Sequence, residues 1–250
     1  MKGFPSIEHR LPMPEVPEVS QEQEILDFDV GIRRSLGQDV PFGYTVEPKI
    51  EGLAVEMVYE RGTLTAASTR GDGQVGELVT ANVKTILTVP LTLFQLDKNK
   101  PIPDLLEVRG IIYMEIEDFR QEKRQGNLPE AASIGDATAH ALMQSNPRIT
   151  ARHPLNVFCS GIGEMSAPLS QSHNELMSLL QLWGLRVNRP HIRVFENMDE
   201  VTAHCRRLGQ ERAQFPYPVQ GAVIRVNEMN IRKQLGEESG RARWTVVFNF

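Results

Sequence analysis

Apolar side chains recur along the chain at two different intervals. Between residues 44 and 68 they occupy every second position, in runs that the turn "ERG" at residues 60–62 separates. This alternation is typical of strands that bury one face, so we predict a β-hairpin in this region. The same reasoning predicts four further strands, in "LLEVRGIIYM" (105–114), "LNVFCSGIG" (155–163), "YPVQGAVIRV" (217–226) and "RWTVVFNF" (243–250).

Among these strands lie segments in which apolar side chains recur every three or four positions, as in an α-helix. We expect one helix over 20–36, with Ser20 and Gln23 as a capping box and Gly37 as its stop, and another over 172–184. Further helical segments are predicted at 78–87, within 117–145 on either side of a loop at 125–130, and at 197–209. Because strands and helices interleave without a regular βαβ alternation, the predicted class is α+β.

Composition and charge then argue against several classes of protein, namely independent nucleic-acid binders, metal-binding proteins and membrane proteins. The 250 residues carry a formal net charge of -5, so the chain lacks the basic stripe typical of independent nucleic-acid binding. Cys159 and Cys205 lie far apart without metal-ligand spacing, so no metal site is predicted. The Pro-rich N-terminus has no signal-peptide core and no apolar run could span a bilayer, so we expect a cytoplasmic protein without a membrane partner.

One lysine raises a question of chemistry. Lys49 lies in "EPKIEGLAV" (47–55) at the start of a strand pattern, between Glu47 and the pair Glu51 and Gly52. A lysine held at the rim of a sheet can attack a phosphorus atom once neighbouring cations lower its pKa. The simpler alternative is a solvated charge at a strand end, which is the commoner case for an isolated lysine.

Seven segments bear on this question because they occur together in one order and spacing. They are "EPKIEGLAV", "STRGDGQVGE" (68–77), "TANVKTI" (80–86), "LEVRG" (106–110), "NPRITARHPL" (146–155), "VQGAVIRV" (219–226) and "LGEESGRARWTVVFNF" (235–250). In this arrangement the chain resembles, from about His9 to Phe250, the adenylation domain of NAD-dependent DNA ligases. The resemblance implies an α+β nucleotidyltransferase fold, ATP-grasp-like, with antiparallel sheets flanked by helices and a nucleotide cleft. We expect a single domain over 1–250, with an extended strap plus helix at 1–40 and the core at 44–250.

The resemblance also implies a reaction. In this family a lysine attacks the α-phosphorus of NAD, nicotinamide mononucleotide leaves, and a lysyl-AMP forms. The AMP then moves to the 5′-phosphate of a nick, from which the 3′-hydroxyl displaces it. If Lys49 is active in this way, NAD or AMP with Mg²⁺ are the implied ligands.

Five positions match the family pattern. Lys49 stands where the family has its nucleophile, and Glu47 where a glutamate contacts the adenine amino group. Gly52 corresponds to a glycine that lets the backbone approach closely. By the same resemblance Arg70 lies on the ribose side of the nucleotide, and Val223 takes the place of an aliphatic residue that packs on the adenine face.

Other positions depart from the family pattern. Arg225 replaces a lysine and keeps the charge without the point-like ammonium. The further departures are Glu51 for aspartate, Ile111 for glutamate, Gly135 and Met143 for arginines, Ser160 for tyrosine, Gln220 for an acid and Asn249 for lysine. A stacked aromatic contributes roughly 1–3 kcal/mol and an ionic hydrogen bond roughly 1.5–3 kcal/mol. Two or three such losses weaken a micromolar nucleotide site to about millimolar.

We therefore expect a pseudo-ligase that binds nucleotide weakly or not at all, has no resident cofactor, and serves a DNA or protein partner. The alternative is an atypical nucleotidyltransferase in which Lys49 still forms lysyl-AMP, with Arg225 and Arg70 replacing the lost cations. The family's nicotinamide-binding module and its OB-fold, zinc-binding, helix-hairpin-helix and BRCT parts have no counterpart in these 250 residues. If Met1 is the natural start, we expect that the protein cannot encircle DNA.

The orientation of Asn249 follows from the alternation of the last strand. Val246 and Phe248 occupy core-facing positions, so Asn249, one position after Phe248, should face away from the core.

Overall fold

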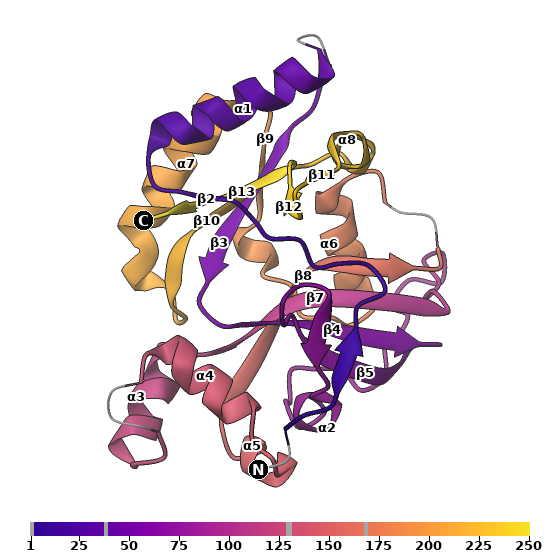
Figure 1. The fold of residues 1–250 in the computed structure, drawn as a ribbon, viewed down its shortest axis with the longest axis vertical. Coiled ribbons are helices and arrows are strands. Elements are labelled where there is room, and N and C mark those ends of the chain that lie inside the picture. Colours follow the sequence, from indigo (N-terminus) through magenta and orange to yellow (C-terminus); the bar gives the residue numbers. More distant parts are fainter. Residues whose placement is uncertain (1–2, 38–39, 129–131, 168–169) are drawn as a thin grey trace.

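The computed structural model describes residues 3–37, 40–128, 132–167 and 170–250, and two sheets dominate it (Figure 1). The four-stranded sheet contains, in spatial order, β5 (Thr63–Thr69), β4 (Leu53–Glu60), β7 (Leu105–Met114) and β8 (Leu155–Met165). The five-stranded sheet contains β2 (Glu18–Val19), β13 (Thr245–Asn249), β10 (Val219–Val226), β3 (Tyr44–Ile50) and β9 (Arg193–Phe195). All neighbours pair antiparallel except β2 and β13, which are parallel. The predicted α+β class with antiparallel sheets is confirmed.

The four-stranded sheet follows directly from the period of two in its sequence. Val55, Met57 and Tyr59 of β4 are fully buried on one face of the sheet. Arg61 and Gly62 both have positive φ, which fits the tight turn of a two-residue hairpin between β4 and β5. The helices that contact this sheet include α2 (Thr80–Val83), α4 (Ile134–Leu142) and α6 (His173–Leu182).

The five-stranded sheet buries its apolar face under two helices, α1 (Glu22–Leu36) and α7 (Met198–Glu211). Ile25 of α1 and Val201 of α7 are fully buried there against strand residues such as Val46 and Ile224. Figure 1 shows α1 and α7 together on one side of β3, β10 and β13. The other face of β3 and β10 is left for polar side chains.

The remaining elements connect the two sheets or lie at their edges. They are α3 (Ile116–Arg124), α5 (Pro147–Thr150), α8 (Met229–Leu235), the 3-10 turns η1 (Arg189–His191) and η2 (Arg212–Gln214), and the short strands β1 (Ser6–Glu8), β6 (Val75–Glu77), β11 (Glu237–Glu238) and β12 (Arg241–Ala242). Tyr113 of β7 stacks on Phe158 of β8 with ring centroids 5.0 Å apart, and both rings meet Tyr217 edge-on. This aromatic cluster joins the sheets. No helix in the described ranges is long and apolar enough to cross a membrane.

The N-terminal strap, residues 3–19, runs in extended form across both sheets. Its β1 pairs with β6 beside the four-stranded sheet, and its β2 pairs with β13 of the five-stranded sheet. Figure 1 shows this indigo segment rising from the lower sheet to the upper one. The strap is therefore a second connection between the two sheets, beside the aromatic cluster.

Three local predictions need correction. The first helix begins at Glu22 rather than Ser20, because the Glu24 carboxylate accepts hydrogen bonds from the backbone N–H groups of Ser20 and Gln21. The predicted helix at 78–87 is a single turn, since Thr80–Val83 gives way to turns before Pro90. Helix α7 continues past Gly209 to Glu211. The end of the predicted loop at 125–130, residues 129 and 130, lies outside the described residues.

Candidate functional site

Lys49 lies near the end of β3, in a row of residues that crosses three strands. Its partner on β10 is Gly221, and the partner of Gly221 on β13 is Asn249. Neighbouring strands are about 4.8 Å apart, so the Lys49 side chain must cross the middle strand to reach Asn249. Gly221 has no side chain to obstruct it, and the Lys49 Nζ donates to Asn249 Oδ1 at 3.1 Å. The predicted orientation of Asn249, away from the core and toward Lys49, is confirmed.

A third residue completes this contact. The Lys49 Nζ donates to Glu18 Oε1 of the strap at 2.7 Å, and Asn249 Nδ2 donates to Glu18 Oε2 at 2.9 Å. We call these three residues the Lys49 triangle. The hydrogen bond from Lys49, followed by the one from Asn249, lowers the pKa of Glu18, so this carboxyl stays ionised. The Lys49 amine thus faces a carboxylate and an amide oxygen.

Glu47 lies two residues before Lys49 on the same face of β3, and it has a cation of its own. Arg225 Nη1 of β10 donates to Glu47 Oε1. The two side chains are 9% and 13% exposed, so this is a mostly buried ion pair. Burial lowers the pKa of Arg225 to about 10, which leaves it charged at neutral pH. Val223 lies directly opposite Glu47 in the ladder.

Two of the departures from the family pattern fit each other. The Glu51 carboxylate accepts a hydrogen bond from the backbone N–H of Gly135 at 3.0 Å, in the first turn of α4. A carboxylate at a helix N-terminus is favourable because the first N–H groups have no partner within the helix. A Cβ at residue 135 would come within 2.7 Å of Glu51 Oε1. In this conformation the Glu51 carboxylate occupies the space that a Cβ at position 135 would need.

Gly52 and Ile111 lie against each other next to this contact. A Cβ at Gly52 would lie 2.1 Å from the Ile112 carbonyl oxygen and 2.7 Å from Ile111 Cγ2. The close backbone approach expected at Gly52 is thus present, and it is made to strand β7. Ser160 falls where the register of β7 against β8 shifts, between Cys159 and Gly161.

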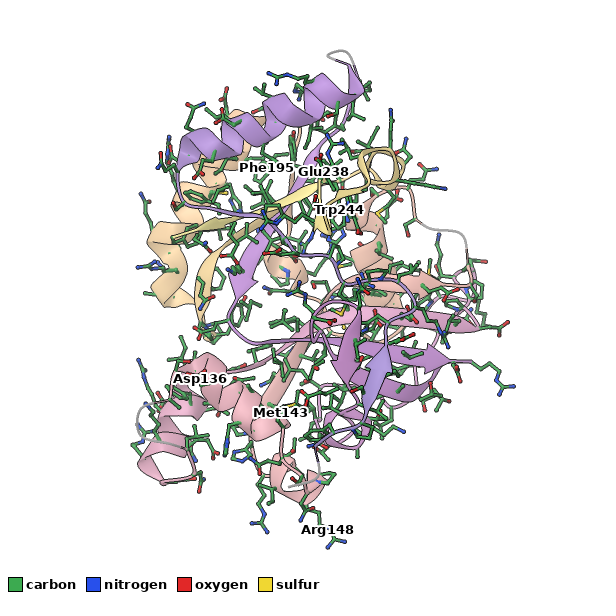
Figure 2. All side chains as sticks on the ribbon, viewed as in Figure 1. Asp136, Met143, Arg148, Phe195, Glu238 and Trp244 are labelled. Atoms are coloured by element: carbon green, nitrogen blue, oxygen red, sulfur yellow. The ribbon has the colours of Figure 1, made fainter. Side chains whose placement is uncertain are left out.

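The other predicted residues are spread around the molecule. Arg70 Nε donates to the Met13 carbonyl of the strap at 3.4 Å. Gln220 is exposed at a register shift in β10, and its carbonyl accepts from the Phe250 N–H at 3.0 Å. Met143 caps the end of α4, and Figure 2 shows it well apart from Trp244, which precedes β13.

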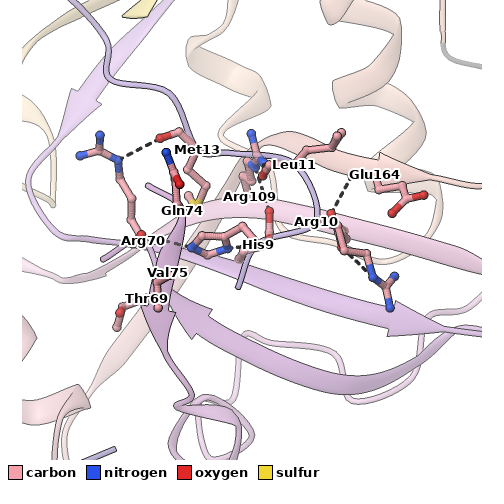
Figure 3. Close-up of polar contacts among 12 residues, drawn as sticks. His9, Arg10, Leu11, Met13, Thr69, Arg70, Gln74, Val75, Arg109 and Glu164 are labelled. Carbon is pink, nitrogen blue, oxygen red and sulfur yellow. Dashed lines mark hydrogen bonds and ion pairs between the residues drawn. The ribbon is translucent and has the colours of Figure 1, made fainter. Parts of the chain in front are cut away.

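A buried polar cluster on the four-stranded sheet was not found from the sequence. His9 Nδ1 of the strap lies 2.8 Å from Glu56 Oε1, and Arg109 Nε donates to Glu56 Oε2 at 2.9 Å. Arg109 Nη2 also donates to the Leu11 carbonyl at 2.6 Å, and His9 Nε2 lies 3.1 Å from the Arg70 carbonyl (Figure 3). We call His9, Glu56 and Arg109 the deep anchor of the strap.

The same cluster continues to a second glutamate. Glu107 accepts from the Glu164 backbone N–H at 2.8 Å, and Arg10 Nε lies 3.6 Å from its other oxygen. Burial, and to a smaller extent the neighbouring Glu56, raise the pKa of Glu107. The sequence signal for this cluster was a set of charged residues within largely apolar strands, namely Glu56 in β4 and, two positions apart, Glu107 and Arg109 in β7.

Comparisons with known proteins agree on one family. The sequence model of the NAD-dependent DNA ligase adenylation domain matches residues 1–250. A DNA ligase of Syntrophotalea carbinolica is 38% identical over 253 residues, and one of Geotalea daltonii is 40% identical over 252 residues. These alignments cover 100% and 99% of this chain and 37% of each relative, so the chain spans little more than a third of their length.

A solved structure gives independent support for the fold. An archaeal ATP-dependent RNA ligase superposes with a TM-score of 0.50 at 15% sequence identity, over 100% of this chain and 48% of that one. At that identity the likeness bears on the fold alone. The family is shown by the sequence model, whose match over residues 1–250 establishes that this chain belongs to the NAD-dependent DNA ligase adenylation domain family.

Proposed function

We propose that this chain is a ligase adenylation-domain homologue in which transfer of AMP to Lys49 is impaired, and that it acts as a binding or scaffold module. The observation that carries the proposal is the Lys49 triangle. A nucleophilic lysine needs a free amine, and cationic neighbours favour that form. Here the Lys49 amine instead donates to the Glu18 carboxylate at 2.7 Å and to Asn249 Oδ1 at 3.1 Å, so the groups that it contacts are hydrogen-bond acceptors and not cations.

The side chains at the adenine and ribose positions of the family are also not available to a nucleotide. Glu47, the residue that resemblance assigns to adenine, is paired with Arg225. Ile111, at the ribose position, offers no hydrogen bond. The residues present therefore do not fit NAD or AMP in the family's mode, and no catalytic step through these ligands follows from them.

The alternative function, an atypical nucleotidyltransferase, has one observation in its favour. Lys49 is retained and its side chain is 23% exposed, so a ligand could reach it. The cations required by this alternative have other partners, however, since Arg225 is bound to Glu47 and Arg70 contacts the Met13 carbonyl. This arrangement supports the impaired form over the active one.

The proposal leaves DNA or a protein as the partner. Membership of a DNA ligase family favours DNA, whereas the net charge of -5 argues against unaided binding to a phosphate backbone. We therefore propose that any contact with DNA depends on additional protein surface. Gel-shift titration of the chain against nicked duplex at about 50 mM and about 200 mM salt tests this, because unaided binding would weaken steeply across that range.

Intact-mass spectrometry tests the proposed loss of adenylation. The protein is incubated with NAD and Mg²⁺, and separately with ATP and Mg²⁺, beside Lys49→Ala and a matched exposed-lysine variant, Lys84→Ala. A DNA ligase from the relatives named above serves as the positive control. We expect no AMP adduct on the wild-type chain. An adduct that persists in Lys84→Ala and disappears in Lys49→Ala would establish the active alternative.

A further inference from the structure

We propose that Glu18 is a built-in anion that occupies an oxyanion subsite formed by Lys49 and Asn249 and thereby controls access of phosphate groups to Lys49. This inference rests on the proposed function and specifies how that site is regulated. Each Glu18 oxygen accepts one hydrogen bond, Oε1 from the Lys49 ammonium at 2.7 Å and Oε2 from the Asn249 amide at 2.9 Å. The same ammonium and amide N–H donors could bind two oxygens of a phosphate group as they bind the two oxygens of this carboxylate.

The contact is built so that it can open. The Glu18 side chain is 53% exposed and that of Lys49 is 23% exposed, so water can replace either partner. The backbone beside Glu18 is held separately, because the Val247 N–H donates to the Pro17 carbonyl at 2.8 Å. The strap is also fixed at the deep anchor, where the His9 and Glu56 side chains are 1% and 3% exposed. The Glu18 side chain can therefore rotate away while the strap stays in place.

The proposed ligand is a phosphate group, either free or carried by a mononucleotide. A ligand phosphate and the Glu18 carboxylate cannot share the subsite, because like charges at this distance repel each other. Exposed ion pairs are weak, so competition by Glu18 should reduce phosphate affinity by roughly two- to fivefold and not abolish it. Removing the carboxylate should restore that factor.

The test compares Glu18→Gln with a matched strap variant. Glu15 is a second exposed strap glutamate that pairs with an arginine, Arg241, so Glu15→Gln removes an equal charge away from Lys49. Inorganic phosphate, AMP and adenosine are titrated by calorimetry at neutral pH into wild type, both single variants and Glu18→Gln with Lys49→Met. We expect Glu18→Gln to bind phosphate and AMP roughly two- to fivefold tighter than wild type, with adenosine unchanged.

The outcomes separate this inference from the proposed function. No gain in Glu18→Gln, an equal gain in Glu15→Gln, or a gain that persists without Lys49 would each overturn the role of Glu18. Equal gains for phosphate and AMP would identify free phosphate as sufficient, whereas a larger gain for AMP would identify a nucleotide. An AMP adduct on wild-type Lys49 would overturn the proposed function and leave the comparison between Glu18→Gln and Glu15→Gln intact.

As a second readout, phosphate added to wild type should shift the Glu18 carboxyl ¹³C resonance toward that of a free glutamate. An unchanged resonance at saturation would contradict displacement of Glu18 by phosphate.

Discussion

The strap is attached to the two sheets by the same kind of chemistry in two different environments. At the deep anchor a strap histidine and a sheet arginine share the Glu56 carboxylate, and the His9 and Glu56 side chains are 1% and 3% exposed. At the Lys49 triangle a strap glutamate meets a sheet lysine, and the side chains are 53% and 23% exposed. Because solvent screens the second contact more than the first, we expect the deep anchor to contribute more to stability than the triangle.

The difference in exposure between the deep anchor and the Lys49 triangle predicts a difference in how much each contributes to stability. Removing one member of a buried ionic cluster leaves an uncompensated charge, which destabilises a protein by about 3–5 kcal/mol. Removing one member of an exposed pair changes stability by about 0–1 kcal/mol. We therefore expect substitutions at Lys49 or Glu18 to change stability little.

The largest effect should come from Glu56→Gln in the deep anchor. The change leaves the Arg109 guanidinium without its carboxylate beneath the strap, so we expect a loss of about 3–5 kcal/mol in the free energy of unfolding. Chemical denaturation measures it, with Glu60→Gln, an exposed glutamate of the same strand, as the control. Equal effects of the two substitutions would contradict the contrast between buried and exposed charges.

The next effect should come from Gly163→Ala in β8. A Cβ at this residue would lie 2.6 Å from Glu107 Oε2 and 2.9 Å from Glu56 Oε2, so the buried carboxylates must move. We expect a loss of about 1–3 kcal/mol in unfolding free energy, the usual range for overpacking. Gly161→Ala, two residues earlier on the same strand with no atom within 4 Å of the new Cβ, should change stability much less. A matching loss in Gly161→Ala would show that the approach to the two carboxylates is not what makes position 163 sensitive.

A pH-dependent effect should come from Glu107. Burial raises its folded-state pKa, so the folded protein holds this proton more tightly than the unfolded chain does. The resulting stabilisation is complete below the ordinary glutamate pKa and is lost as pH rises through the raised value. Relative to Glu107→Gln, wild type should therefore lose stability as pH rises above the ordinary glutamate pKa, by less than the effect of Glu56→Gln. Denaturation curves of both proteins across that range measure the difference, and a relative gain with rising pH would refute the burial argument.

The smallest effect should be found at the triangle itself. Glu18→Gln should change the free energy of unfolding by no more than about 1 kcal/mol, because the pair is exposed. In wild type the hydrogen bond from Lys49 lowers the Glu18 pKa, so the contact is lost as pH falls through that lowered value. Lys49→Met should return the Glu18 pKa toward the ordinary value in a ¹³C carboxyl titration. A Glu18 pKa that does not respond to Lys49→Met would show that the side chains do not meet in solution.

Several local features were predictable because neighbouring residues decide them. The strand "LLEVRGIIYM" matches β7 over Leu105–Met114, and the alternation in the last strand correctly directed Asn249 toward Lys49. The capping residue of α1 was misplaced by one position, since Ser20 and Gln21 both bond to Glu24 and the spacing rule does not choose between them.

The contacts made by the residues that depart from the family pattern could not be predicted from the sequence. Glu51 and Gly135 were noted as two separate departures, yet one contact joins them across 84 positions of sequence. Arg225 was considered as a replacement cation near the phosphates, and it pairs with Glu47 instead. Such contacts depend on how sheets, helices and strap pack, and nothing in the local pattern encodes their distance.

The sequence by itself determined the class of fold, the family and the strand that carries Lys49, because hydrophobic period and motif order are properties of short segments. Only the tertiary structure decided what the Lys49 amine meets. Glu18 is 31 positions from Lys49 and 231 from Asn249, and the three meet because β2, β13, β10 and β3 lie side by side with a glycine in the intervening strand. An electrostatic environment is set by charges within a few ångströms in space, and their separation along the chain does not limit it.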